Sequence, residues 1–207
     1  MECLRLEGLN NLRIRTEHPC GGSRPTVVFE FLIELTASPG YVRAMRVLGI
    51  DPGLYITGYG IVDEDKGKIK LVEAGVIRTI RSLSTGDRLA DIARELEGII
   101  AQFKPEIVSI EELYSHYAHP KTAIIMGHAR GIVFLKAAEA GIEVVPYAAT
   151  RIKKSLTGNG RASKAQMQQM IQSTLALKNI PEPADAADAL AIALCHALSA
   201  QQQAALS

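Results

Sequence analysis

The chain has 207 residues, of which 47% are hydrophobic and 22% are charged, and its formal net charge is +1. This length suits one well-buried domain, and because the net charge is near zero, any case for nucleic-acid binding must rest on local charge. The cysteines form no CxxC pair, which favours a reduced, cytoplasmic setting over a disulfide framework: they are Cys3, Cys20 and Cys195. No apolar run reaches the roughly 18 residues of a membrane helix.

Residues 1–44 differ from the rest of the chain. They contain scattered turn formers and a single apolar patch, Val27–Leu35. We expect a poorly ordered extension, or upstream sequence translated ahead of a natural start at Met45, with a docking arm as the alternative. The segment carries no recognisable chemistry.

A regular pattern of strands begins after Met45. A strand at 46–50 is followed by two more, joined by an Asp–Glu–Asp–Lys–Gly turn, which predicts an antiparallel meander. A helix with one apolar face then follows, and two further strands enclose a second helix. The predicted ranges are Thr57–Val62 and Lys68–Arg78 for the meander, 87–103 for the first helix, Ile107–Ile110, 121–140 for the second helix and Ile142–Tyr147.

The remainder of the chain is predicted to be helical. We expect a short helix at 149–156, a helix that starts at Ser163 with Gln166 completing a capping box, a last helix at 185–199 and a flexible tail at 200–207. This order predicts an α/β domain over 45–199. Its mixed five-stranded sheet would begin with an antiparallel meander, have its first, fourth and fifth strands parallel, and carry helices on both faces.

Two carboxylates follow neighbouring strands of this sheet. Asp51 ends the first strand, where Pro52 and Gly53 stop it, and Glu111 ends the fourth. Because the fourth strand would lie beside the first, both acids would meet at the carboxyl ends of parallel strands, where α/β sheets bind their ligands. Glu112 points to the opposite face and is the weaker candidate.

The last helix supplies two more acids. Asp185 and Asp188 are three residues apart, hence on one helical face, and Ile192 and Cys195 continue that face as its buried side. Each aspartate alone would suit helix capping or the helix dipole. Their flanks are alanine and leucine, however, and two inward acids without a partner base need a cation.

Clustered carboxylates are hard oxygen ligands, which suit Mg²⁺ or Mn²⁺ rather than zinc. Two loop histidines, His116 and His119, could suggest zinc, but they lack a third ligand. A pair of divalent ions on carboxylates fits in-line hydrolysis of a phosphodiester.

The stretch from Val144 to Pro181 contains no acidic residue. Its basic residues include Arg151, Lys153, Lys154, Arg161 and Lys164. A solvated basic face is the alternative to nucleic-acid binding. Lys164 lies in the first turn of its predicted helix, where a cation is unfavourable unless an anion such as phosphate is nearby. Tyr114, just after the Glu111 strand end, could stack on an unpaired base.

Four motifs together resemble the RuvC Holliday-junction resolvases, RNase H-like endonucleases of bacterial recombination and repair. They are Gly49–Gly53, Ile110–Tyr114, Gly127–Gly131 and Ala184–Leu190, and the resemblance covers about 45–199 in the family's order. It implies a homodimer that cuts a four-way DNA junction symmetrically, with Mg²⁺, thymine-rich preference and 5′-phosphate products. It also implies partnership with the RuvA–RuvB branch-migration complex.

By position, the resemblance implies catalytic and metal-binding roles for Asp51, Glu111, Asp185 and Asp188, with two Mg²⁺ ions per site and Mn²⁺ able to replace them. It implies phosphate contacts for Lys153 and Lys164, the latter also offsetting transition-state charge, and base contacts for Tyr114. Residues 1–44 depart from the family pattern, and His128 stands where many relatives have Gln.

Three other hypotheses compete with this one. A strand ending in Asp-x-Gly also occurs in actin-like ATPases, but this chain lacks the second loop and domain of that fold. A non-catalytic junction-binding protein would gain nothing from the acids, which repel DNA. A nuclease of the same fold could instead act on nicked or flapped DNA.

Overall fold

The computed structural model describes residues 45–113 and 120–205. The predictions made for 1–44, Tyr114, His116 and His119 lie outside these residues. Five strands form one sheet in the order β3-β2-β1-β4-β5. They are β1 (Met45–Asp51), β2 (Ile56–Asp65), β3 (Lys68–Arg78), β4 (Ile107–Glu111) and β5 (Glu143–Tyr147).

The predicted connectivity of the sheet is confirmed. β1 pairs antiparallel with β2 and β2 with β3, whereas β1, β4 and β5 run parallel. The Asp–Glu–Asp–Lys–Gly turn closes the β2–β3 hairpin, with Lys66 and Gly67 both at positive φ. Glycine adopts that conformation without a Cβ clash, which explains its place at the end of the turn.

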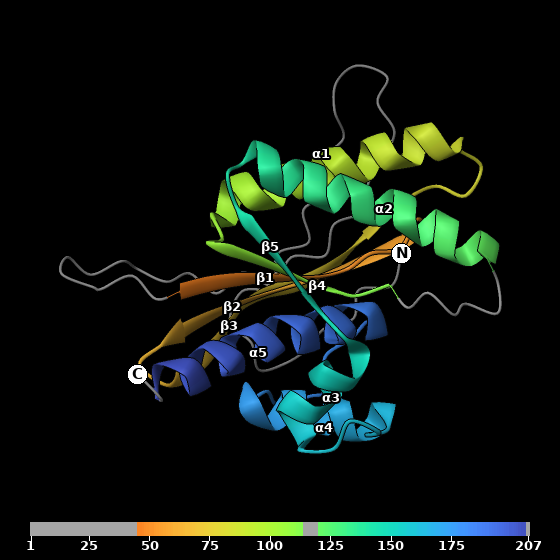
Figure 1. The fold of residues 1–207 in the computed structure, drawn as a ribbon. Coiled ribbons are helices and arrows are strands. Elements are labelled where there is room, and N and C mark those ends of the chain that lie inside the picture. Colours follow the sequence, from red (N-terminus) through yellow and green to blue (C-terminus); the bar gives the residue numbers. More distant parts are fainter. Residues whose placement is uncertain (1–44, 114–119, 206–207) are drawn as a thin grey trace.

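Helices cover both faces of the sheet, as expected (Figure 1). One face carries α1 (Thr85–Phe103) and α2 (Pro120–Glu139), and the other carries α5 (Ala184–Ala204), with α3 (Ala149–Thr157) and α4 (Lys164–Thr174) beyond it. Each face has its own apolar core, one including Leu48 and Ile50 and the other including Val47 and Leu190. Adjacent residues of β1 thus enter opposite cores, as the alternation of a strand requires.

A capping box determines where α4 begins. Ser163 accepts from the Gln166 backbone N–H while the Gln166 side chain accepts from Ser163 N–H, so the predicted capping box is confirmed.

Helix α5 continues to Ala204 instead of ending at 199, and the predicted flexible tail is helical over that stretch. Alanine and glutamine favour helix, and Gln201 Nε2 donates to Glu64 Oε1 at 3.3 Å.

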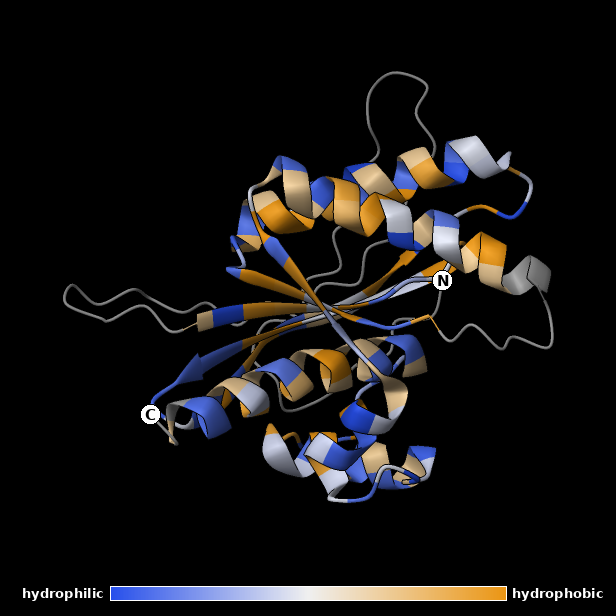
Figure 2. Ribbon diagram, viewed as in Figure 1, coloured by the Kyte–Doolittle hydropathy of each residue, from blue (hydrophilic) through white to orange (hydrophobic). Residues whose placement is uncertain are grey.

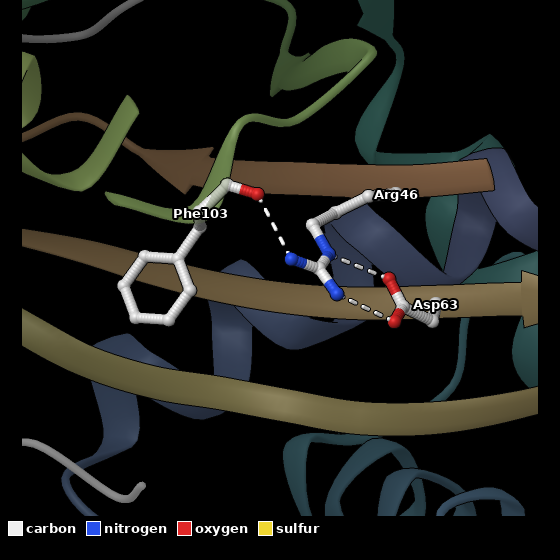
Figure 3. Close-up of polar contacts among 3 residues, drawn as sticks. All are labelled: Arg46, Asp63 and Phe103. Carbon is white, nitrogen blue, oxygen red and sulfur yellow. Dashed lines mark hydrogen bonds and ion pairs between the residues drawn. The ribbon is translucent and has the colours of Figure 1, made fainter. Parts of the chain in front are cut away.

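Arg46 anchors the start of β1, at the opposite end of the strand from Asp51. Arg46 donates from Nε and Nη2 to the two carboxylate oxygens of Asp63 at 2.7 and 2.8 Å, and from Nη1 to the Phe103 carbonyl at 2.9 Å (Figure 3). This bidentate geometry is the strong form of an arginine–carboxylate pair. It joins β1, β2 and the end of α1, so the start of the strand that carries Asp51 is fixed to its neighbours.

Helix α2 leaves apolar side chains uncovered. Ile124, Phe134 and Leu135 are 59%, 40% and 50% exposed, and orange, the apolar colour, marks several turns of this helix in Figure 2. Within the described residues, no helix is both long enough and apolar enough to cross a membrane.

Candidate active site

The carboxyl ends of two parallel strands bring the first two acids together. β1 and β4 are in register from Val47 opposite Ile107 to Ile50 opposite Ile110, so the next pair along is Asp51 and Glu111. Ile50 and Ile110 both enter the core beneath α1 and α2. Because side chains alternate along a strand, Asp51 and Glu111 both face α5.

Helix α5 lies unusually close to the sheet because glycines face its alanines. A Cβ on Gly49 would overlap the Ala189 carbonyl oxygen, and a Cβ on Gly58 would overlap the Asp185 carbonyl oxygen. Gly58 is the β2 partner of Asp51. The first turn of α5, which carries Asp185, therefore lies directly over the residue next to Asp51.

The α5 acids are not used as helix caps. The N-cap is Pro183, without a side-chain cap bond, and Asp185 is the second residue of the helix. Both Asp185 and Asp188 lie at the rim of the core, partly exposed, rather than inside it. The N-cap interpretation is therefore wrong for Asp185, and its negative charge acts on Asp51 instead.

The acids perturb one another. Burial raises the pKa of Asp51, and the negative charges of Asp188, Glu111 and Asp185 raise it further, to about 7, against an opposing effect of Lys164. Burial and then Asp188 also raise the pKa of Glu111, while Lys153 and Arg130 lower it. Carboxylates with raised pKa values at one strand edge are typical of a site that functions with a cation.

The donor set fits a hard divalent cation. Three carboxylates, from β4 and α5, act electrostatically on Asp51 of β1. A bound cation would relieve the repulsion that raises the pKa of Asp51. Among the residues that the structure describes, however, no three Asp, Glu, His or Cys side chains form a group that could hold an ion as they stand. The backbone brings the acids together, and side-chain adjustment would have to complete the coordination.

The Lys164 side chain lies among these acids. Its Nζ donates to Asp188 Oδ2 at 3.0 Å, and this bond, with smaller effects of Asp185 and Asp51, raises the pKa of the lysine. The anion that offsets this first-turn cation is thus Asp188. As expected, the acids of α5 have no partner base near them in sequence. In the folded structure, however, Lys164 of α4 is such a partner for Asp188.

The other basic candidates divide into two groups. Lys153 lies close enough to Glu111 to lower its pKa, so α3 also contributes a cation to the site. The guanidinium of Arg151 lies 5.0 Å from the centre of the Tyr147 ring instead. Lys154 and Arg161 are exposed and affect the pKa of neither Asp51 nor Glu111.

Sequence reasoning assigned no role to Arg130. This α2 residue donates from Nη1 to the backbone carbonyl of Glu111, and its guanidinium lies 5.1 Å from the centre of the Phe134 ring. It therefore fixes the end of β4 that presents Glu111. Its place within the Gly127–Gly131 motif was the available signal, but the motif does not indicate what the arginine contacts.

Comparison with known proteins identifies the family. The model of the family described as crossover junction endodeoxyribonuclease RuvC matches residues 47–196. The chain belongs to the RuvC family. A RuvC from Rhodopirellula baltica is 48% identical over 161 residues, which cover 78% of this chain and 89% of the relative. One from Alkaliphilus oremlandii is 45% identical over 153 residues, covering 74% and 93%.

Solved structures agree with the family in fold. The Thermus thermophilus RuvC in complex with a Holliday junction substrate superimposes with a TM-score of 0.73 and 36% identity, over 77% of this chain and 96% of that one. The yeast mitochondrial Holliday junction resolvase Ydc2 has a TM-score of 0.57 at 16% identity, over 81% and 83%, and supports the fold alone. The RNase H-like expectation is confirmed. Family membership identifies the chain as a divalent-metal-dependent nuclease and removes the actin-like alternative.

Proposed function

We propose that this protein resolves four-way (Holliday) DNA junctions during homologous recombination and repair. It cuts two opposed strands symmetrically by hydrolysis, leaving 5′-phosphate and 3′-hydroxyl ends. The observation that carries this proposal is the placement of α5. Its first turn lies over Gly58, the strand partner of Asp51, and three other acids raise the pKa of Asp51. Related proteins carry the name crossover junction endodeoxyribonuclease RuvC, which supplies the substrate.

The cofactor proposed is Mg²⁺, two ions per site, with Mn²⁺ able to replace it. The residues that would hold these ions are Asp51, Glu111, Asp185 and Asp188. When bound, such ions activate the attacking water and stabilise the leaving oxygen of the phosphodiester. Carboxylate oxygens match the hard-ligand preference of both metals, and the chemistry of this donor set does not distinguish between them.

The basic residues divide the remaining work. Lys164, bonded to Asp188 in the free protein, can turn to the scissile phosphate once Asp188 is engaged elsewhere, where its charge offsets the charge that develops in the transition state. Lys153, near Glu111, contacts an adjacent phosphate. Arg151, Lys154 and Arg161 extend the positive surface along α3 and the loop that follows it. Tyr114 engages an unstacked base at the crossover.

Paired cuts require two active sites, and we propose that they come from a homodimer. The exposed positions Ile124, His128, Gly131 and Leu135 of α2 recur at helical spacing and form one stripe along the helix. Large apolar side chains exposed on one helix, here Ile124 and Leu135 near the two ends of the stripe, are typical of a protein–protein contact. We also propose that the dimer works with the RuvA–RuvB branch-migration complex, as the family resemblance implies.

The test is cleavage of a synthetic mobile four-way junction in Mg²⁺, with a plain duplex of the same sequence as control. Wild-type protein should yield nicked duplexes with 5′-phosphates, and Asp51→Asn should bind the junction without cutting it. Equal cleavage of plain duplex, or strong cleavage by Asp51→Asn, would contradict the proposal. Preferential cleavage of nicked or flapped DNA would support the same-fold nuclease with a different branched substrate.

A further inference from the structure

Two arginines lie over the ring of an exposed tyrosine in the loop between β1 and β2. Tyr55 follows Asp51 by four residues, lies just before β2 and is 41% exposed. The guanidinium carbons of Arg81 and Arg88 lie 5.0 and 4.6 Å from the centre of its ring. These distances are within the range of a cation–π contact. None of these three residues takes part in the site described above.

Hydrogen bonds of Arg88 and Thr79 fix this arrangement. Arg88 of α1 is only 8% exposed, and it donates from Nε to the Ile80 carbonyl at 3.2 Å and from Nη2 to the Arg81 carbonyl. Thr79 adds two bonds, from its N–H to the Tyr55 carbonyl at 3.1 Å and from its hydroxyl to the Leu54 carbonyl at 2.6 Å. Tyr55 and the loop that carries Arg81 are therefore fixed relative to each other, and a ligand would not have to order them.

The charges of this surface lack an anionic partner among the described residues. Residues 74–86 contain no acid, and Arg78 and Arg81 are both exposed. The ion pairs between described residues include neither of them, nor Arg88. Two guanidinium groups over one ring repel each other, so an anion bound beside Arg81 would be favoured.

The surface lies at the same end of the sheet as the acids. Figure 1 shows the segment between β3 and α1 at the end where β1 stops and α5 begins, on the α1 side of the sheet. Helices α3 and α4, which carry Lys153 and Lys164, lie on the α5 side. The acids thus have positive surfaces on both sides.

We propose that Tyr55, Arg78 and Arg81 bind the phosphate backbone of the duplex arm next to the cut, on the side of the acids away from α3 and α4. The guanidinium fork matches phosphate geometry, and stacking on Tyr55 leaves the edge of the Arg81 group available for it. Arg88 is a positioning residue, because it is buried and its Nε and Nη2 already donate to carbonyls of the loop. This inference rests on the proposed function and adds a second contact surface for the same substrate.

The test compares Arg81→Ala with the full-length wild type. Affinity for a four-way junction and for a plain duplex is measured in EDTA, as a function of salt. We expect Arg81→Ala to weaken both by about five- to tenfold at 0.1 M salt, and to reduce the slope of log K against log salt by about 1. Arg81→Lys should recover part of the loss, and Tyr55→Ala should weaken binding whereas Tyr55→Phe should not.

Arg94→Ala is the matched control, because Arg94 is an exposed arginine of α1, the helix that follows the segment with Arg81, and it pairs with Asp91. It should leave the affinity and the salt slope unchanged. If Arg81→Ala binds like the wild type, or loses affinity for the junction only, the duplex-arm contact is refuted. An equal loss in Arg94→Ala would reduce the effect to general charge and would also refute it.

Cleavage separates this inference from the proposed function. At protein concentrations below saturation in Mg²⁺, Arg81→Ala should cut the junction more slowly than the wild type, in proportion to its loss of affinity, since a phosphate contact acts mainly on binding. Wild-type protein that fails to cut any junction would contradict the proposed function. Wild-type cleavage together with unchanged binding by Arg81→Ala would contradict only the further inference.

Discussion

The repulsion among the acids should make the metal-free protein less stable than it would be without Asp51. Burial and three neighbouring carboxylates raise the pKa of Asp51 from 3.8 to about 7. A carboxyl group with a raised pKa in the folded state is held more tightly in its neutral form than it is in the unfolded chain. Folded protein therefore binds more protons between these two values, and stability falls as the pH rises through that window.

The size of the effect follows from the shift. A difference of about 3 pKa units corresponds to about 4 kcal/mol at 1.36 kcal/mol per unit, which is the upper limit above pH 7. Because Asp51 keeps some contact with water, we expect ~1–3 kcal/mol. Asp51→Asn removes the titrating group with little change in shape. Its gain in stability over the wild type should be small at pH 4, grow between pH 4 and 7, and be constant above that.

Urea unfolding in EDTA at pH 4, 6 and 8 measures this difference directly. Asp91→Asn is the control, because Asp91 pairs with Arg94 on α1 away from the acids, and it should give no gain that increases with pH. Lower stability of Asp51→Asn than of the wild type at pH 8 would refute the reasoning. So would a gain of the same size at all three pH values.

Three further outcomes follow from the structure. Lys164→Ala should lower single-turnover cleavage by at least tenfold and junction affinity by less than threefold, whereas a loss confined to affinity would make the lysine a positioning contact. Gly58→Ala should cost about 1–3 kcal/mol in urea unfolding and lower cleavage, because its Cβ would displace the Asp185 backbone, and a fully active variant would contradict the close packing of α5. The double variant Ile124→Glu/Leu135→Glu should be monomeric by light scattering at concentrations where the wild type is dimeric, and a persistent dimer would place the interface elsewhere.

Strand order and alternation were sufficient to predict the first half of the site. Asp51 and Glu111 were placed at one sheet edge because short apolar runs ended on them, and because a meander leaves β1 only one free side for a parallel neighbour. Helical spacing predicted that Asp185 and Asp188 share a face. Both predictions use spacings within single strands and helices, and regular secondary structure converts such spacings into positions in the fold.

Contacts between separate elements could not be predicted in the same way. The Lys164–Asp188 pair depends on how α4 sits against α5, and the bond from Arg130 to the Glu111 carbonyl depends on how α2 crosses the end of β4. The Tyr55 surface likewise joins a loop to a buried arginine of α1. Neither propensity nor periodicity carries that information, because each contact is set by tertiary packing.

Acids from β1, β4 and α5 should together form one site that a divalent ion stabilises. Thermal unfolding with and without Mn²⁺, for the wild type and for Asp188→Asn, tests this expectation most directly. Asp188 is distant from Asp51 and Glu111 in sequence and approaches them only in the folded structure. The wild-type melting temperature should rise with Mn²⁺ by mass action, and Asp188→Asn should lose more than half of that rise. A Mn²⁺-dependent rise in Asp188→Asn equal to that of the wild type would contradict the claim.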